Sequence, residues 1–279
     1  MFALRCKPLI MGILNATPDS FSDGGQFVDV YAALTHAQDM LADGVDIIDI
    51  GGESTRPGAE PVSSDEQIKR VIPIISGIRE QVSKDVLISI DTTRRAVAEA
   101  ALNAGANWIN DVSGGTEDPA ILDLAAQANV PIILMHRLGV SKTMQDQPYY
   151  EDVVSEVKLV LQACINNALA AGIKQQHIVI DPGIGFGKRK VDNLDLLANL
   201  ETFVAMGYPV LLGTSRKRFM GNICTINEPT ELVTATAVTT AIGVMAGVHL
   251  FRVHDIKENR QALEVAYAIQ QRRDRQGQA

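Results

Sequence analysis

Apolar stretches rich in β-branched residues recur along the chain and alternate with stretches whose apolar positions have helical spacing. This alternation predicts strands joined by helical crossovers, as a parallel sheet requires. The repeat is about 34 residues, so eight units fill the chain. We therefore expect an α/β fold, a closed (β/α)₈ TIM barrel forming a single domain over residues 1–279, with a doubly wound open sheet as the alternative. The apolar runs begin near Ile10, Val45, Val86, Asn107, Pro131, Ile178, Val210 and Val248.

The helical stretches carry recognisable start and stop signals. Ser64 and Gln67 form a capping box ahead of a one-sided apolar stripe between Ile68 and Val82. Glycine easily adopts the left-handed conformation that ends a helix, and it follows three of the predicted helices. These positions are Gly44, Gly105 and Gly172.

The stretch from Glu231 to Val248 differs from the other helices because threonine, alanine and glycine line it on several faces. A helix without a polar face is expected to be buried, either against the barrel or against a second subunit. We therefore expect a homodimer formed through this helix.

The composition is that of a globular protein, since 46% of the 279 residues are hydrophobic and 21% are charged. A net charge of −8 argues against nucleic acid as the main partner, so basic residues gathered in one place would serve an anion. Cys6, Cys164 and Cys224 have no metal-ligand spacing and are typical of reduced thiols. With no signal-peptide pattern and no apolar segment of membrane-spanning length, we expect a soluble, cytoplasmic protein.

Polar or charged residues stand at the carboxyl end of every predicted strand or directly after it. In a (β/α)₈ barrel these ends meet on one face, where active sites are built. The amino ends of the strands carry no comparable set. The sequence therefore predicts a polar site made from Asn15, Gly51–Gly58, Asp91, Asn110–Asp111, Met135–His136, Asp181, Ser215–Lys217 and Arg252–Asp255.

Basic residues concentrate after the last two predicted strands. Arg252 and His254 are two apart on a strand and therefore point to the same side, with Lys217 after the preceding strand. Loops after strands seven and eight are a frequent phosphate site in such barrels, and these side chains suit a multiply charged phosphate. The alternative for the strand-eight residues is a surface ion pair with Asp255.

Asp91 and Asp181 end strands that are otherwise nearly all aliphatic. A buried carboxylate needs a donor, and a ligand that presents two parallel N–H groups would match it. The alternative is that both are structural aspartates satisfied by Lys217, Arg94 or loop amides.

The glycine-rich segment Asp181–Lys188 has neither the spacing of a phosphate loop nor that of a dinucleotide fingerprint. We interpret it as a lip that lets the backbone and Phe186 approach a flat ligand. No His, Cys or Asp cluster has zinc spacing, and no serine stands in a nucleophile elbow.

These segments together resemble the dihydropteroate synthase family of the folate pathway, in the family's order from about Ile10 to the last helix. The first two of the matching motifs are long and highly specific. The motifs are Gly12–Gly25, Gly51–Gly58, Ser89–Thr92, Ile109–Val112, Leu134–His136, Asp181–Lys188, Thr214–Lys217 and Arg252–Asp255.

The resemblance implies a (β/α)₈ barrel that joins hydroxymethyl-dihydropterin pyrophosphate to p-aminobenzoate, with pyrophosphate as the leaving group. By motif, the pterin would be held by Asp91, Asn110, Met135, Asp181, Phe186, Gly213 and Lys217. Asn15, Arg252 and His254 would hold the pyrophosphate, with Asn15 also reaching a Mg²⁺ ion, and these three with Lys217 would be the catalytic residues. The p-aminobenzoate loops would carry Asp19, Phe21, Thr55, Arg56, Pro57 and Ser215.

The family's chemistry also explains why no acid–base pair is evident. The enzyme need only stabilise the leaving anion and protect the pterin cation from water, since the arylamine is the nucleophile. Sulfonamides, which are flat anilines, would compete with p-aminobenzoate.

The chain departs from some family members at two places. Arg218 replaces a serine, which affects the expected contact to the p-aminobenzoate carboxylate, and Arg137–Leu138 differs without a clear consequence. A pterin-binding methyltransferase barrel and a non-catalytic pterin carrier are the alternatives. Neither needs both the pyrophosphate cations and the two long loops.

Overall fold

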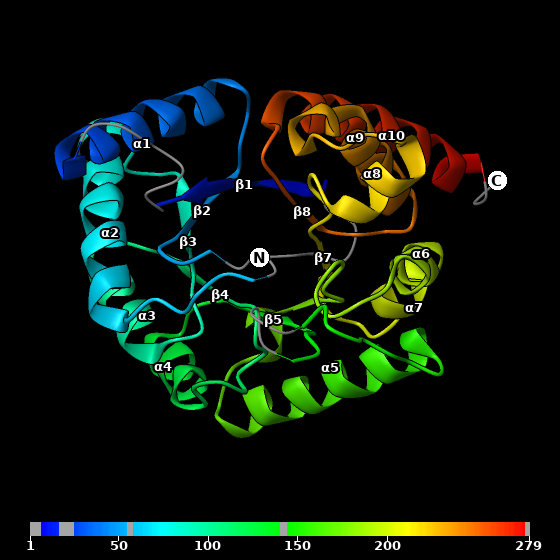
Figure 1. The fold of residues 1–279 in the computed structure, drawn as a ribbon, viewed down its shortest axis with the longest axis horizontal. Helices are drawn as coiled ribbons and strands as arrows, with labels where there is room; N and C mark the ends of the chain where they lie inside the picture. Colours follow the sequence, from blue (N-terminus) through cyan, green and yellow to red (C-terminus); the bar gives the residue numbers. More distant parts are fainter. Residues whose placement is uncertain (1–6, 17–24, 55–57, 140–143, 277–279) are drawn as a thin grey trace.

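The computed structural model describes residues 7–16, 25–54, 58–139 and 144–276. Within them, eight strands alternate with helices, and the helices surround the strands (Figure 1). Each strand begins within two residues of the predicted position, so the expected (β/α)₈ barrel is confirmed. The strands are β1 (Leu9–Asn15), β2 (Ile47–Gly51), β3 (Leu87–Asp91), β4 (Trp108–Asp111), β5 (Ile132–Met135), β6 (Ile178–Asp181), β7 (Leu211–Leu212) and β8 (Leu250–Val253).

The strands pair in parallel in the order β6-β5-β4-β3-β2-β1-β8-β7. The ring closes through a parallel bridge between Ile180 of β6 and Val210, just before β7. There the Ile180 amide donates to the Pro209 carbonyl at 2.9 Å. This closure rules out the doubly wound open sheet and brings all the carboxyl ends to one face.

The crossovers are helical throughout the described residues. Those after β1, β3 and β4 are single helices, and those after β2, β5, β6 and β7 each contain two or three helical segments. The helices are α1 (Gly25–Ala42), α2 (Ser64–Gly77), η2 (Ile78–Val82), α3 (Arg95–Asn103), α4 (Ala120–Ala128), α5 (Val153–Ala170), η3 (Gln175–His177), α6 (Lys190–Ala198), α7 (Leu200–Val204), α8 (Arg218–Cys224), η4 (Pro229–Glu231), α9 (Val233–Met245) and α10 (Ile256–Gln276).

The predicted helix punctuation is confirmed in part. Gly44, Gly105 and Gly172 have φ of +89°, +112° and +92°, as expected at helix ends. The capping box is wrong, because the cap of α2 is Ser63, whose side chain accepts from the Glu66 amide at 3.3 Å. Gln67 is instead buried, and its side-chain amide donates to Glu53 at 2.8 Å. It therefore anchors the loop after β2 rather than the end of the helix.

Apolar side chains inside the barrel form one layer, and this layer positions the site. Strand side chains alternate, so the next inward position lies two residues closer to the carboxyl end. At that position β2 carries Asp49, β4 Asn110, β6 Asp181 and β8 Arg252. The apolar layer is therefore the floor beneath a polar layer, and it consists of Met11, Ile47, Trp108, Ile133, Val179, Leu211 and Leu250.

One helix among the described residues, α5, has the length and mean hydropathy (1.2) to cross a membrane, contrary to the expectation that no segment would. It packs against β5 and β6 as a crossover of the barrel. Its buried residues recur at helical spacing, from Val153 and Val157 through Leu161 to Ala168. The apolar composition of α5 is therefore explained by packing against the barrel.

Candidate active site

One half of the polar layer is linked by Arg252, and we call Asp49, Asp91, Asn110 and Arg252 the arginine half. The guanidinium of Arg252 donates from Nε to Asp49 Oδ2 at 2.6 Å and from Nη2 to Asp91 Oδ2 at 2.5 Å. Asn110 donates from Nδ2 to the same Asp49 oxygen at 3.0 Å. One guanidinium therefore links residues of β2, β3 and β8, and Asn110 links β4 to them through its hydrogen bond to Asp49.

The charges of the arginine half are strongly perturbed by burial. Burial raises the pKa of Asp91 to about 7; Arg252 opposes this rise, whereas neighbouring carboxylates, Asp49 first, add to it. For Arg252, burial lowers the pKa, but Asp49 and Asp91 outweigh it and raise the pKa overall. The Oδ1 atoms of Asp49 and Asp91 are buried without a hydrogen-bond partner among the described residues, and so is Ser89 Oγ. The Asp91 carboxylate therefore has an oxygen that can accept from a bound ligand.

Sequence reasoning missed Asp49, and it did not identify the partners that Arg252 and Asp91 have within the protein. Asp49 stands inside an apolar run, where a single charged residue suggests a break in the strand rather than a member of the site. The alternative considered for Arg252, an ion pair with Asp255, is not what the structure shows, because Asp255 binds Arg216, with Nη2 and Oδ1 2.6 Å apart. Asp91 is bound by Arg252, which was not among the protein donors considered for it. The signal that could have identified Asp49 was a charged residue at a strand position that faces the inside of the barrel.

The other half of the layer lies on β5, β6 and the loops that follow, and we call His136, Asp181, Phe186, Lys188 and Lys217 the lysine half. Asp181 Oδ1 accepts from the Gly183 amide at 2.7 Å, so the loop-amide alternative holds for this carboxylate. Burial raises the pKa of Asp181 to about 6, against the lowering effects of the Gly183 amide and of the Lys188, Lys217 and Arg252 charges.

The flat-ligand lip predicted from the glycine-rich segment is present as an apolar surface. Phe186 belongs to a buried cluster with Val112, Met135 and Met144. The Lys217 ammonium lies 4.0 Å from the centre of the Phe186 ring, a cation–π contact.

Gly213 lies between the two halves. A Cβ built on Gly213 would lie 3.8 Å from Arg252 Cβ and 3.9 Å from Asp181 Oδ2. The pterin residues expected from the sequence, namely Asp91, Asn110, Met135, Asp181, Phe186, Gly213 and Lys217, thus all lie in these two halves or beside them.

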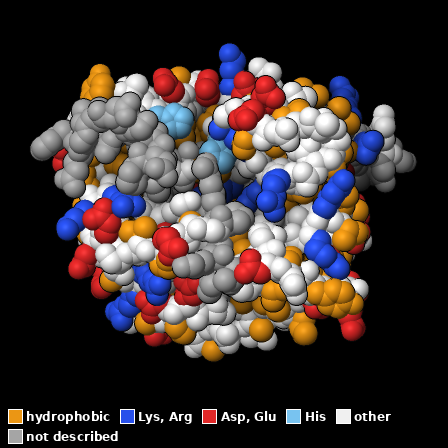
Figure 2. All heavy atoms as spheres, in the orientation of Figure 1, with side chains coloured by type: hydrophobic (Ala, Val, Ile, Leu, Met, Phe, Trp, Pro, Cys, Tyr) orange, Lys and Arg blue, Asp and Glu red, His pale blue; other side chains and the backbone are white. Residues whose placement is uncertain are grey.

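Ser215 and His254 meet at the rim after β7 and β8. Ser215 Oγ lies 2.9 Å from His254 Nδ1 and accepts from the His254 amide at 3.1 Å. The sequence had assigned Ser215 to the p-aminobenzoate loops and His254 to the anion site, so the structure joins two expected subsites. Figure 2 shows His, Lys and Arg side chains near the middle of the molecule, although the net charge is −8.

The structure also places some of the other residues that the sequence analysis singled out. Asn15 ends β1 opposite Gly51 and is partly buried. Arg218 is exposed at the start of α8, and Arg137 forms an ion pair with Glu117, which joins the loops after β4 and β5. The predicted p-aminobenzoate residues Asp19, Phe21, Thr55, Arg56 and Pro57 lie outside the described residues.

Comparisons with known proteins agree with this geometry. Residues 11–254 match the model of the pterin binding enzyme family. The chain is 46% identical to the dihydropteroate synthase of Bacillus subtilis over 90% of this chain and 85% of that one. It superposes with a TM-score of 0.90 on the dihydropteroate synthase of Clostridium difficile solved with pteroic acid, at 42% identity over 96% and 99% of the two chains. It superposes with a TM-score of 0.89 on the Yersinia pestis dihydropteroate synthase solved with a sulfonamide drug, at 40% identity over 97% of this chain and 96% of that one.

The chain therefore belongs to the family of pterin-binding enzymes. Within them it is a member of the dihydropteroate synthases, which confirms the resemblance carried by its motifs.

Proposed function

We propose that the chain joins hydroxymethyl-dihydropterin pyrophosphate to p-aminobenzoate, forming dihydropteroate and releasing pyrophosphate, which makes it a transferase. The observation that carries the proposal is the convergence of Asp91, Asn110 and Asp181 above the apolar floor, each at least 95% buried. Buried carboxylates and an amide above an apolar surface suit a flat ring with N–H groups along one edge.

In this proposal both halves of the polar layer contribute side chains to the pterin site. Asp181, Asn110, Asp91 and Lys217 hold the polar edge, while Met135 and Phe186 contact the faces. Asp181 is preorganised by the Gly183 amide, and the Lys217–Phe186 contact fixes the position of one face. Gly213 lies beside Asp181, where its backbone would border the ring.

Asn15, Arg252 and His254 hold the pyrophosphate. Arg252 already binds Asp49 and Asp91, so it supplies a fixed positive charge rather than a mobile side chain. Ser215 orients the His254 ring. The loops with Asp19, Phe21, Thr55, Arg56 and Pro57 complete the p-aminobenzoate pocket.

A Mg²⁺ ion would be bound by the side-chain oxygen of Asn15 together with the substrate. The described residues contain no group of three or more His, Cys, Asp or Glu that could hold a metal. An ion that keeps several waters and binds through one protein oxygen and phosphate fits this donor set. When bound, it neutralises charge on the leaving pyrophosphate.

The chemistry asks little of the protein as acid or base. The bond to pyrophosphate breaks at a carbon attached to the electron-rich dihydropterin, into which positive charge spreads. Arg252 and His254 stabilise the leaving anion, and the arylamine then attacks the carbon without a strong protein base. The protein's task is to place these charges and to exclude water.

The decisive experiment follows pyrophosphate with Mg²⁺ and the pterin substrate, with and without p-aminobenzoate. We expect rapid release with both substrates and slow release with hydrolysed pterin when p-aminobenzoate is omitted. Absence of cleavage and of bridging-oxygen isotope scrambling until p-aminobenzoate is added would favour direct displacement. Absence of any reaction with both substrates, with transfer of a methyl group from a methylated pterin instead, would favour the methyltransferase alternative.

Competition by sulfonamides tests the second substrate. A sulfonamide is a flat aniline with an acidic group para to the amine, as p-aminobenzoate is. We expect inhibition that rising p-aminobenzoate relieves. Inhibition that p-aminobenzoate leaves unchanged would contradict a shared pocket.

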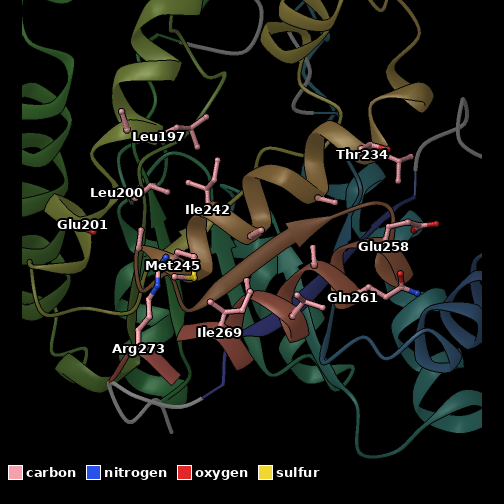
Figure 3. Close-up of a pocket in the computed structure, with 18 residues that line it drawn as sticks. Leu197, Leu200, Glu201, Thr234, Ile242, Met245, Glu258, Gln261, Ile269 and Arg273 are labelled. Carbon is pink, nitrogen blue, oxygen red and sulfur yellow. The ribbon is translucent and has the colours of Figure 1, made fainter. Parts of the chain in front are cut away.

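The homodimer expected from the sequence would form through a groove of about 950 Å³ between α9, α10 and the α6–α7 segment (Figure 3). Val265 is 62% exposed there, and Ile242 and Ile269 are each 49% exposed. Glu258 and Arg273 lie at opposite ends of the groove, which suits pairing of two antiparallel copies (Figure 3). Light scattering should give a dimer; a monomer at micromolar concentration would contradict this. The cytoplasm is the compartment we propose, on the basis of the cysteine pattern.

A further inference from the structure

The loop after β6 has no regular secondary structure between Asp181 and Lys190, so its conformation depends on contacts other than a helix or strand ladder. Gly183, Gly185 and Gly187 have φ of +68°, +82° and +62°. A Cβ at Gly183 would lie 1.9 Å from the His136 carbonyl oxygen, and a Cβ at Gly187 would lie 2.4 Å from that of Leu138. The loop thus lies backbone against backbone on the loop after β5.

Most carbonyls of this loop receive a hydrogen bond from a side chain. Tyr150 donates to the Gly187 carbonyl at 2.9 Å, and Gln145 donates to the Gly185 carbonyl at 2.8 Å. The carbonyls of Gly183 and Phe186 both accept from Lys188 Nζ, at 2.8 and 3.1 Å. Lys188 is therefore the side chain that holds the loop on both sides of its tip.

Lys188 is 3% exposed, and its third donor goes to His136 Nδ1 at 2.9 Å. An ammonium group has three N–H donors and no acceptor, so His136 must accept at Nδ1 and carry its proton on Nε2. In agreement, burial and the Lys188 charge lower the pKa of His136 to about 3, which keeps the ring neutral. The ammonium thus cross-links the loop after β6 to the first residue after β5.

We propose that Lys188 is a positioning residue for pterin binding. It acts through two residues that would contact the pterin. Lys188 fixes Phe186 by donating to its backbone carbonyl. It also donates to the carbonyl of Gly183, the residue whose amide donates to the Asp181 carboxylate. The inference rests on the proposed pterin roles of Asp181 and Phe186. It explains the Met135–His136 and glycine-rich motifs as one rigid unit.

The charge on Lys188 has a second consequence, for Asp181. The cations that face Asp181 are Lys188 from its own loop, Lys217 after β7 and Arg252 on β8, and all three lower the pKa of its carboxyl. Burial lowers the pKa of Lys188 to about 7, with Asp181 and Asp192 raising it and Lys217 lowering it further. The charge is therefore present where Asp181 titrates, near pH 6, and it favours the ionised carboxylate that a pterin N–H group needs.

The test compares Lys188→Met with Lys190→Met, which removes an exposed lysine two residues away. Lys188→Met should raise the KM for the pterin substrate about tenfold or more, since three charge-assisted bonds are lost, and leave the KM for p-aminobenzoate unchanged. The pH below which pterin affinity falls should move upward by ~1 unit. Lys190→Met should change neither quantity.

Two further variants separate the cross-link from the charge. Lys188→Gln keeps amide donors without the charge, so it should lose less affinity than Lys188→Met but show the full pH shift; if Lys188→Met does not fold, this shift alone decides. Tyr150→Phe removes one neutral bond from the same loop and should leave the pH profile in place.

The outcomes distinguish this inference from the proposed function. A wild-type protein that binds no pterin would overturn the proposed function itself. A wild-type protein that binds pterin, with folded Lys188 variants whose pH profile and pterin KM are unchanged, would overturn only the positioning role. Equal rises in both KM values would also overturn it, because they indicate a general structural effect.

Discussion

The arginine and lysine halves hold the same group, a buried carboxylate at the end of a strand, in different ways. Asp91 on β3 is bound by a side chain from β8, 161 residues away in sequence. Asp181 on β6 is bound by the Gly183 amide of its own loop. The arginine half therefore depends on pairing between the first and last strands, β1 and β8, whereas the lysine half is organised by one local segment.

The two carboxylates also show that a direct ion pair does not by itself offset the effect of burial on the pKa of a carboxyl. Asp91 contacts a guanidinium, yet burial and nearby carboxylates raise its pKa to about 7. Asp181 reaches only about 6, because a backbone amide and three cations oppose burial. Arg252 shares its charge between Asp49 and Asp91, so the balance of charges in each half decides, not the shortest contact.

The largest expected effect comes from breaking the arginine half. Arg252→Met leaves Asp49 and Asp91 buried without their cation, and it should lower the free energy of unfolding by about 3–5 kcal/mol and abolish turnover. Arg252→Lys keeps the charge but not the two-pronged geometry, so turnover should still be markedly impaired. Denaturant unfolding and pyrophosphate release measure the two effects.

The control is Arg216→Met, which breaks the partly buried pair with Asp255 at the rim, where the two side chains are 28% and 14% exposed. That change should cost less than Arg252→Met, because it leaves one partly exposed carboxylate, rather than two buried ones, without a cation. Near-normal turnover of Arg252→Lys would place the anion site elsewhere.

The next effect comes from the lysine half. Asp181→Ala should lose pterin affinity by about 1.5–3 kcal/mol for each ligand hydrogen bond removed. The structure adds a reason to the one expected from the sequence, since Asp181 Oδ1 also accepts from the Gly183 amide, which the variant would leave without this acceptor. Calorimetry on the folded variant measures the loss.

Asp181→Asn is the matched variant, because its side-chain oxygen can still accept from Gly183 while the charge is gone. We expect it to lie between wild type and Asp181→Ala. Unchanged pterin affinity in a folded Asp181→Ala protein would show that this carboxylate serves the loop alone.

The comparison also explains what could be predicted from the sequence. Strand periodicity predicted the positions of the strands and placed Asp91, Asp181 and Arg252 at their carboxyl ends, because these depend on local pattern. It could not identify the partners, which depend on which strands become neighbours in the barrel: Arg252, expected at an anion site with Asp255 as the alternative partner, binds Asp49 and Asp91.

Two other misses have local causes. Ser63 and Ser64 are adjacent and equally suitable as a helix cap, and only the backbone path selects Ser63. Lys188 resembled the lysine of an imperfect phosphate loop, and its sequence position gave no sign that its ammonium turns inward onto His136.

The smallest expected effect, a difference in pH dependence, sharpens the comparison most. A carboxyl whose pKa is raised from 3.8 in the folded protein binds more protons than in the unfolded chain between the two pKa values. Each group therefore lowers stability as pH rises, Asp181 until about pH 6 and Asp91 until about pH 7, by up to about 1.4 kcal/mol per unit. The neutral His136 has a lowered pKa and acts in the opposite direction below its usual 6.5, so absolute curves mix these groups. Asp181→Asn and Asp91→Asn each remove one of them, and the difference from wild type in urea unfolding isolates it. Each difference curve should show that the carboxyl costs stability as pH rises above 3.8 and should level off near the raised pKa of that group; a flat difference curve for either variant would mean that burial does not raise the pKa of that carboxyl.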